Sequence, residues 1–242
     1  ELLEQLGNSI RGIPALEYLL FDPEGNPTQI LQSITTDPNA ARRCSLMKTL
    51  GTDLVVQAQI LFQAWDPQGG NFHSQFSQPG SEGSPFDSAT DSLGVMLNQL
   101  GELIEILKDL RLGVPLGKSS GGTPQPEGVL NPYSHQTVTA LQKNLEGFEA
   151  VYLGQLDGMG SPGLYDYVFS LDQYEAEEVL KRLALTMEAI QNIPEPLSDT
   201  VLNNPQPVDQ AYQRAMELRD LILGPISGIV GVTTSFADSD ND

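Results

Sequence analysis

The segment Arg11-Gly12-Ile13-Pro14-Ala15-Leu16-Glu17-Tyr18-Leu19-Leu20-Phe21-Asp22 places the carboxylate of Glu17 inside an otherwise apolar run that ends at Asp22. An ionised carboxylate left unpaired against apolar neighbours costs several kcal/mol. Glu17 is therefore expected to face water, to pair with Arg11, Arg42 or Arg43, or to bind a ligand. Proline is common in the first turn of a helix, so Pro14 is compatible with a short helix that has a purely structural role.

The same segment resembles the signature segment of the imelysin-like proteins. This family of bacterial envelope proteins was first named for an insulin-cleaving peptidase, and it includes iron-regulated protein A and alginate-binding relatives. The family motif is Gly-x-His-x-x-Glu. Gly12 and Glu17 occupy its first and last positions, whereas Pro14 stands where the histidine is expected.

Two further stretches carry the resemblance, which spans residues 11 to about 154. The first begins a long helix at Arg42-Arg43 and ends at Ala64-Trp65. The second begins at Pro132-Tyr133-Ser134 and leads into Asn144-Leu145-Glu146-Gly147 and Tyr152-Leu153-Gly154.

Apolar residues recur at three- and four-residue intervals along most of the chain, which is the spacing of one helix face. Helices are predicted over residues 38–65, 87–110, 134–152, 164–171, 174–192 and 207–223, and another is expected to end near Gln5. Asp37-Pro38 is predicted to start the longest helix, and Gly224-Pro225 to end the last one. No stretch shows the period-two alternation of a strand, so the predicted fold class is all-α.

The resemblance implies two packed antiparallel helical bundles. The first is expected over residues 1–112, which carry the Gly-x-Pro-x-x-Glu segment, and the second over residues 132–242, with a linker at 113–131. Because the chain opens in the middle of a helical pattern, the resemblance also implies that the first bundle lacks upstream helices. The acidic stretch 237–242 is expected to be solvated.

Acidic residues outnumber basic ones by 32 to 12, and the formal net charge is −20. Such a field repels phosphate backbones and anionic lipid surfaces, so nucleic acid is not expected as a partner. The single cysteine, Cys44, excludes an intramolecular disulfide and is expected to be a packed thiol. The sequence contains no apolar run of membrane-spanning length. The resemblance implies a protein of the bacterial periplasm or outer membrane, which is either soluble or held at a membrane through a lipid anchor outside this chain.

The residues argue against hydrolysis by the usual routes. A zinc peptidase needs three protein ligands, usually including two histidines, and an open position for water. The chain has only His73 and His135, neither with metal-ligand spacing, and Pro14 can neither bind a metal nor transfer a proton. No Gly-x-Ser-x-Gly motif is present. No catalytic residue is therefore predicted.

Three roles remain open for the signature segment. It can form a polar pocket for a small or oligomeric ligand, it can bind iron or another divalent cation through Glu17, or it can tie the two bundles together. The predicted ligand-binding residues are Arg11, Gly12, Pro14, Glu17, Arg43, Tyr133 and Ser134.

The prediction is an imelysin-like envelope protein that binds a metal or small ligand in a cleft between the bundles and takes part in iron uptake. Two alternatives stay open: a metallopeptidase of the imelysin family with a degenerate motif, and an oligosaccharide-binding protein of the alginate-binding type.

Overall fold

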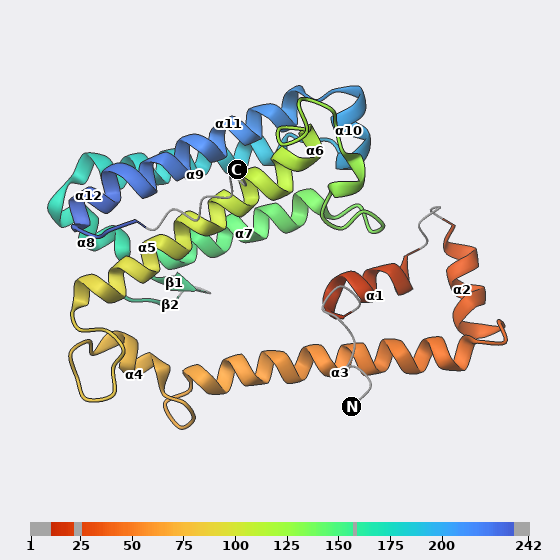
Figure 1. Ribbon diagram of the computed structural model, residues 1–242, viewed down its shortest axis with the longest axis horizontal. Helices are drawn as coiled ribbons and strands as arrows, with labels where there is room; N and C mark the ends of the chain where they lie inside the picture. Colours follow the sequence, from red (N-terminus) through yellow and green to blue (C-terminus); the bar gives the residue numbers. More distant parts are fainter. Residues whose placement is uncertain (1–10, 22–25, 157–158, 235–242) are drawn as a thin grey trace. The chain divides into compact units, whose positions relative to one another are not determined.

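The computed structural model describes residues 11–21, 26–156 and 159–234, which form two compact units (Figure 1). The first unit comprises residues 1–75 and 131–135, and the second comprises residues 76–130 and 136–242. The helix expected near Gln5 and the acidic stretch 237–242 lie outside the described residues. The fold is all-α, as predicted.

The first unit is built on one long helix. Its helices are α1 (Gly12–Leu20), α2 (Pro27–Thr35) and α3 (Ala40–Trp65), and α4 (Phe72–Ser77) leads the chain out of it. Both α1 and α2 pack against α3. The side chain of Asn26 caps α2 by accepting hydrogen bonds from the backbone N–H groups of Thr28 and Gln29, and Pro27 occupies the first helical position.

The long helix begins later than predicted. Asp37-Pro38 does not start α3, because the Asp37 carboxylate accepts a hydrogen bond from the backbone N–H of Asn39 at 2.7 Å and so stabilises a turn instead. The helix begins at Ala40, with Asn39 as its N-cap. This turn fixes the corner between α2 and α3.

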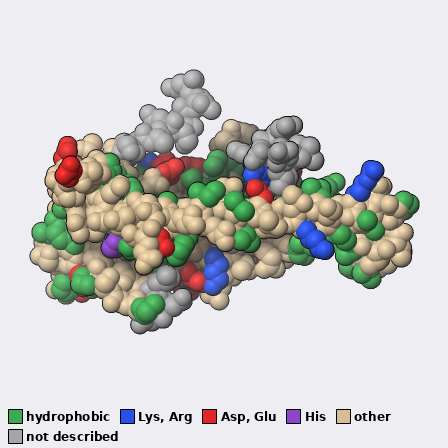
Figure 2. All heavy atoms as spheres, turned by 90° about the horizontal axis from the view of Figure 1, so that it is seen from below, with side chains coloured by type: hydrophobic (Ala, Val, Ile, Leu, Met, Phe, Trp, Pro, Cys, Tyr) green, Lys and Arg blue, Asp and Glu red, His purple; other side chains and the backbone are tan. Residues whose placement is uncertain are grey.

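The first unit has a thin core. Within its described part, Leu50 is the buried apolar residue of α3 and Glu17 is the buried residue of α1. The predicted apolar face of α3 is otherwise largely open to solvent, with Leu61 64% and Trp65 43% exposed. Apolar side chains are visible on the surface that α3 presents in Figure 2.

The second unit contains the main hydrophobic core. Its helical elements are α5 (Ala89–Glu105), a π-helical segment (Ile106–Gly113), α6 (Val114–Leu116), a 3₁₀ turn (Pro126–Gly128), α7 (Thr137–Leu153), α8 (Leu164–Leu171), α9 (Gln173–Gln191), α10 (Leu197–Asn203), α11 (Gln206–Leu221), a second π-helical segment (Ile222–Ile226) and α12 (Ser227–Val230). Helix α11 packs against α9 and α5, and α7 packs against α9 (Figure 1). The buried side chains at its centre include Leu97, Leu141, Phe148, Leu183 and Leu218.

The boundaries of the compact units differ from the predicted bundle boundaries. Helix α5, predicted to belong to the first bundle, packs in the second unit because Leu97, Leu100 and Ile104 are buried in its core. Residues 113–130 of the predicted linker 113–131 also belong to this unit, since Leu116 and Val129 are buried there. Burial of these apolar side chains holds the segment in place.

Two local features of the second unit were not predicted. Gly224-Pro225 does not end the last helix, because the helix continues through these residues as a π-helical segment. It ends with α12 at Val230, and its C-cap Gly231 has a φ of 75°. Proline cannot donate the usual helical hydrogen bond, and the wider π-helical turn accommodates it. A short antiparallel strand pair joins β1 (Gln155–Leu156) and β2 (Met159–Gly160).

Candidate functional site

The carboxylate of Glu17 is buried and hydrogen-bonded to a distant segment of the chain. Glu17 is 6% exposed, and its Oε1 accepts a bond from the backbone N–H of Ser134 at 2.9 Å and another from the Ser134 hydroxyl at 2.6 Å. Both residues belong to the first unit. Hydrogen bonds to an ionised acceptor are shorter and stronger than neutral ones, so this contact offsets the desolvation of the carboxylate.

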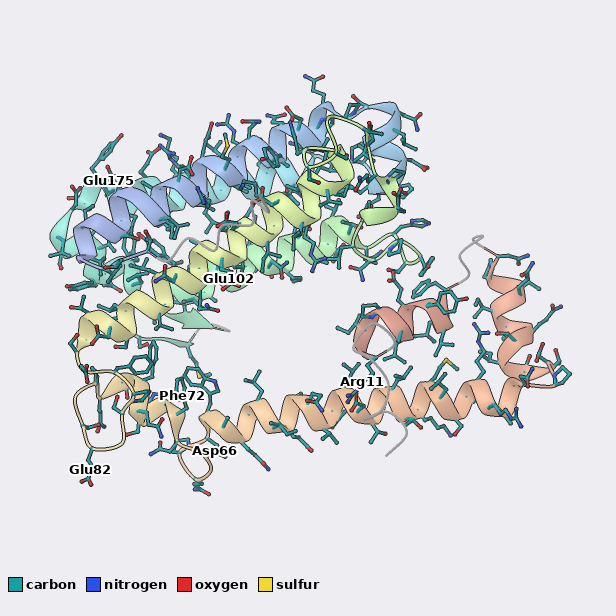
Figure 3. All side chains as sticks on the ribbon, in the orientation of Figure 1. Arg11, Asp66, Phe72, Glu82, Glu102 and Glu175 are labelled. Atoms are coloured by element: carbon teal, nitrogen blue, oxygen red, sulfur yellow. The ribbon has the colours of Figure 1, made fainter. Side chains whose placement is uncertain are left out.

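The start of the signature helix is held by an ion pair that the sequence did not predict. Arg11, which is labelled in Figure 3, donates from Nη2 and Nε to Oδ1 and Oδ2 of Asp53 at 2.6 and 3.2 Å, so the pair is bidentate. The hydrogen bond and charge of Arg11 hold the pKa of the Asp53 carboxyl below its ordinary value. Asp53 is the only acidic residue within the long helix 40–65. This isolated carboxylate was the sequence feature from which an ion pair could have been predicted.

Gly12 and Pro14 shape the entry into α1. Gly12 has a φ of 76°, a left-handed conformation that favours glycine, and it is the first residue of the helix. Pro14 is exposed in the first turn, where no backbone donor is required. The segment therefore folds as a short helix with a defined entry angle, and the position of the family histidine carries a side chain without a donor or acceptor.

Tyr133 and Arg43 also contact α1. The rings of Tyr133 and Tyr18 meet edge to face with centroids 5.6 Å apart, beside the bond from Ser134 to Glu17. The Nη2 of Arg43 donates to the carbonyl oxygen of Leu19 at 3.4 Å. Arg43 thus approaches the C-terminal end of α1, where the carbonyl groups lack helical partners.

The structure brings together only some of the predicted site residues. Glu17, Tyr133 and Ser134 form one contact group, and Arg11 is drawn to Asp53. The hydrogen bonds to Glu17 come from Ser134 rather than from Arg11, Arg42 or Arg43, which were the expected partners. The sequence could not give this pairing, because Glu17 and Ser134 are 117 positions apart.

The described residues do not match a resident metal centre. Among residues 11–21, 26–156 and 159–234, no group of three or more His, Cys, Asp and Glu side chains is placed to hold a metal ion. Glu17 is the only acidic residue of α1, and its Oε1 already accepts two hydrogen bonds. The role of Glu17 as a metal ligand stays a prediction.

The remaining candidate side chains lie apart from the signature segment. His73 lies in α4, and His135 is exposed with a φ of 54°. Cys44 is half-buried on α3, where its Sγ lies 3.5 Å from the carbonyl oxygen of Ile34, as expected for a packed thiol. None of the helices within the described ranges combines the length and the hydropathy that a membrane-spanning helix needs.

The fold and the signature segment define a class of all-α protein. Its Gly-x-Pro-x-x-Glu helix carries a buried glutamate that accepts hydrogen bonds from a serine in a later segment. The sequence model of the imelysin family matches residues 1–222. The chain therefore belongs to the imelysin family.

Two solved structures share the fold. An imelysin peptidase from Bacteroides ovatus is 20% identical, with a TM-score of 0.62 over 72% of this chain and 50% of the other. A protein described as an iron-regulated protein A precursor from Parabacteroides distasonis is 17% identical, with a TM-score of 0.73 over 91% of this chain and 63% of the other. The chain thus spans less than two thirds of either protein. No curated protein sequence is significantly similar to it.

Proposed function

We propose that this chain is a binding protein of the imelysin family that does not hydrolyse peptides and that serves iron uptake in the bacterial cell envelope. The observation that carries the proposal is the state of the Glu17 carboxylate. It is buried and held by two hydrogen bonds from Ser134, and the family histidine is replaced by Pro14. A carboxylate in this setting orders a loop instead of activating water.

The contacts around α1 suit a recognition surface. Exposed Tyr18 contacts Tyr133, and Glu17 accepts a hydrogen bond from the backbone of Ser134, the next residue in the chain after Tyr133. Aromatic rings that are held in place bind ligands at a low cost in side-chain entropy. Of the predicted site residues, Tyr133 and Ser134 are therefore the proposed ligand contacts, with Glu17 in a positioning role. Ligand binding by Arg11, which is paired with Asp53, and by Gly12 stays a prediction.

The link to iron rests on likeness. A structure that shares the fold over most of this chain is described as an iron-regulated protein A precursor. The described residues offer no cluster of three metal-binding side chains, so iron is proposed as cargo rather than as a catalytic cofactor. Placement in the periplasm or at the outer membrane belongs to the same proposal.

The proposal is tested by titrating metal-stripped protein with ferrous iron, ferric citrate, zinc and calcium in a calorimeter, with citrate alone as the reference for the chelate. We expect saturable binding of one iron form with a defined stoichiometry. Glu17→Ala should weaken that binding, because the segment bearing Ser134 and Tyr133 loses its anchor. Glu82→Ala, which removes an exposed loop carboxylate in the second unit, is the matched control.

Hydrolysis is measured on the same samples. A neighbour in fold is an imelysin peptidase, so the alternative is a metallopeptidase with a degenerate motif. Zinc-dependent cleavage of an unfolded protein that Glu17→Ala abolishes would overturn the proposal. Flat titrations with every metal would remove the iron link, and saturable binding of an acidic oligosaccharide would then support the alginate-binding alternative.

A further inference from the structure

A pocket lies at the corner between the end of α2 and the start of α3, within the first unit. Its volume is ≈ 410 Å³, and it is lined by Ser33, Asp37, Asn39, Arg42, Arg43 and Leu46. Glu17, Tyr133 and Ser134 are not among these lining residues. The corner is held by the turn at Asp37 and by the hydrogen bond from the Ser33 hydroxyl to the carbonyl oxygen of Ile30 at 2.7 Å.

The arginines of this pocket are unusual for so acidic a chain. With 32 acidic and 12 basic residues, an arginine has many potential partners. Within the described ranges, however, neither Arg42 nor Arg43 forms an ion pair, whereas Arg11, Arg182, Arg214 and Arg219 do. Both lining arginines therefore keep their charge available to a ligand.

Arg43 also has a buried nitrogen without a partner. Among the described residues, its Nε forms no hydrogen bond, although the Nη2 donates a long bond to the carbonyl oxygen of Leu19. A buried donor without a hydrogen bond destabilises the protein. A ligand that accepts a hydrogen bond from the Arg43 guanidinium, after a rotation of that group, would offset part of this destabilisation. Arg42 is exposed, so its five donors can meet a ligand with little rearrangement.

The charges of the lining residues disfavour cations and favour a negatively charged ligand. Arg42 and Arg43 contribute two positive charges and Asp37 one negative charge, so the pocket is net positive on a chain with a net charge of −20. The first-turn amides of α3 begin in the same corner, and the positive end of a helix adds to the attraction for anions. Leu46 provides an apolar wall beside the charged groups.

From these observations we infer that the corner between α2 and α3 binds a small molecule bearing an oxyanion, a carboxylate or a phosphate group, through Arg42 and Arg43. Guanidinium groups pair with either oxyanion through two parallel hydrogen bonds. The Asn39 side chain, which does not cap α3, is available as a further donor. Asp37 opposes the anion and keeps the affinity moderate.

The test is calorimetric titration of metal-free protein with citrate and, separately, with inorganic phosphate at constant ionic strength. Saturable binding of one probe at a single site is expected, and the probe that binds identifies the oxyanion as carboxylate or phosphate. Arg42→Gln should weaken binding at least about tenfold, as expected from the loss of a charge-assisted hydrogen bond. Asp37→Asn should strengthen binding, because it removes the opposing charge and keeps an acceptor for the Asn39 N–H.

Lys48→Gln is the matched control. Lys48 is an exposed basic residue on the same helix and does not line the pocket, so its loss changes net charge by the same amount. Equal weakening by Lys48→Gln and Arg42→Gln would show attraction to general charge and overturn the proposal. Absence of binding by both probes, or binding weakened by Asp37→Asn, would overturn it as well. Glu17→Ala should leave this affinity unchanged, so the result does not depend on the proposed function.

Discussion

Ser134 donates both its backbone N–H and its hydroxyl to one oxygen of Glu17, at 2.9 and 2.6 Å. The two residues are 117 positions apart, and their contact fixes residues 131–135 against α1 inside the first unit. The buried charge is thereby satisfied without an arginine. The Gly-x-Pro-x-x-Glu segment thus acts first as an anchor for a loop.

Removal of this contact should destabilise the first unit. Glu17→Gln replaces a charged acceptor with a neutral one and buries an amide donor that needs a partner, so a loss of about 1–2 kcal/mol in the free energy of unfolding is expected. Ser134→Ala should cost about 1 kcal/mol. Trp65 is the only tryptophan and lies on α3, so its fluorescence during urea unfolding reports on the first unit.

A double-mutant cycle separates this contact from other effects. The double variant should cost less than the sum of the single ones by about 0.5–1 kcal/mol, because Ser134→Ala removes the hydroxyl bond to residue 17 that Glu17→Gln weakens. Ser45→Ala, at an exposed position of α3, is the control and should be close to neutral. Full additivity would mean that the bond from the Ser134 hydroxyl contributes nothing to stability.

Stability of the first unit should depend on the ionisation of Asp53. Arg11 lowers the folded-state pKa of Asp53 below the ordinary value of 3.8, so the folded state binds fewer protons than the unfolded state at acid pH. The stabilisation is present above the unfolded-state pKa and is lost as the pH falls below it. Thermal unfolding followed by Trp65 fluorescence should show wild type melting above Asp53→Asn at pH 7, with the difference shrinking towards pH 3. A difference that does not vary with pH would contradict this assignment.

Glu195 should stabilise two helices at once in the second unit. Its Oε1 accepts from the backbone N–H of Val138 in the first turn of α7 at 2.5 Å, and its Oε2 accepts from that of Leu197 at the start of α10 at 2.8 Å. Glu195→Ala leaves both donors unmet and should cost about 2 kcal/mol, as expected for lost helix caps. Circular dichroism during urea unfolding measures the loss, and Glu188→Ala, an exposed glutamate of α9, should change little.

Two glycines on helices should respond to alanine with opposite signs. A Cβ at Gly101 would lie 2.3 Å from Cδ2 of Leu223, so Gly101→Ala overpacks the core and should cost about 1–3 kcal/mol. A Cβ at Gly147 meets nothing within 4 Å in the described structure, and Gly147→Ala in the interior of α7 should add about 0.5–1 kcal/mol. Shifts in the urea midpoint of the circular dichroism signal decide both. If Gly101→Ala and Gly147→Ala changed the urea midpoint equally, the Leu223 side chain would have to move away from residue 101 without loss of stability.

The helices were predictable because their information is local. Apolar residues at helical spacing mark α7, α9 and α11 to within a few residues, and the family could be inferred from residues 11–21 with the two later stretches. Helix ends were less predictable. Asp37-Pro38 and Gly224-Pro225 carry strong start and stop signals, yet a local hydrogen bond and a π-helical segment override them.

The sequence by itself determined the all-α class, the membership of the imelysin family and the proline at position 14, where the resemblance implies a histidine, because each depends on local patterns of residues. Only the tertiary structure decided that α5 packs with the second unit, that Glu17 is paired with Ser134 and that Arg11 is paired with Asp53. These partners are far apart in sequence. The sequence shows that a carboxylate among apolar residues needs a hydrogen-bond partner and that an apolar helix face needs to be buried. The packing of the whole chain decides which residues provide that partner and that cover.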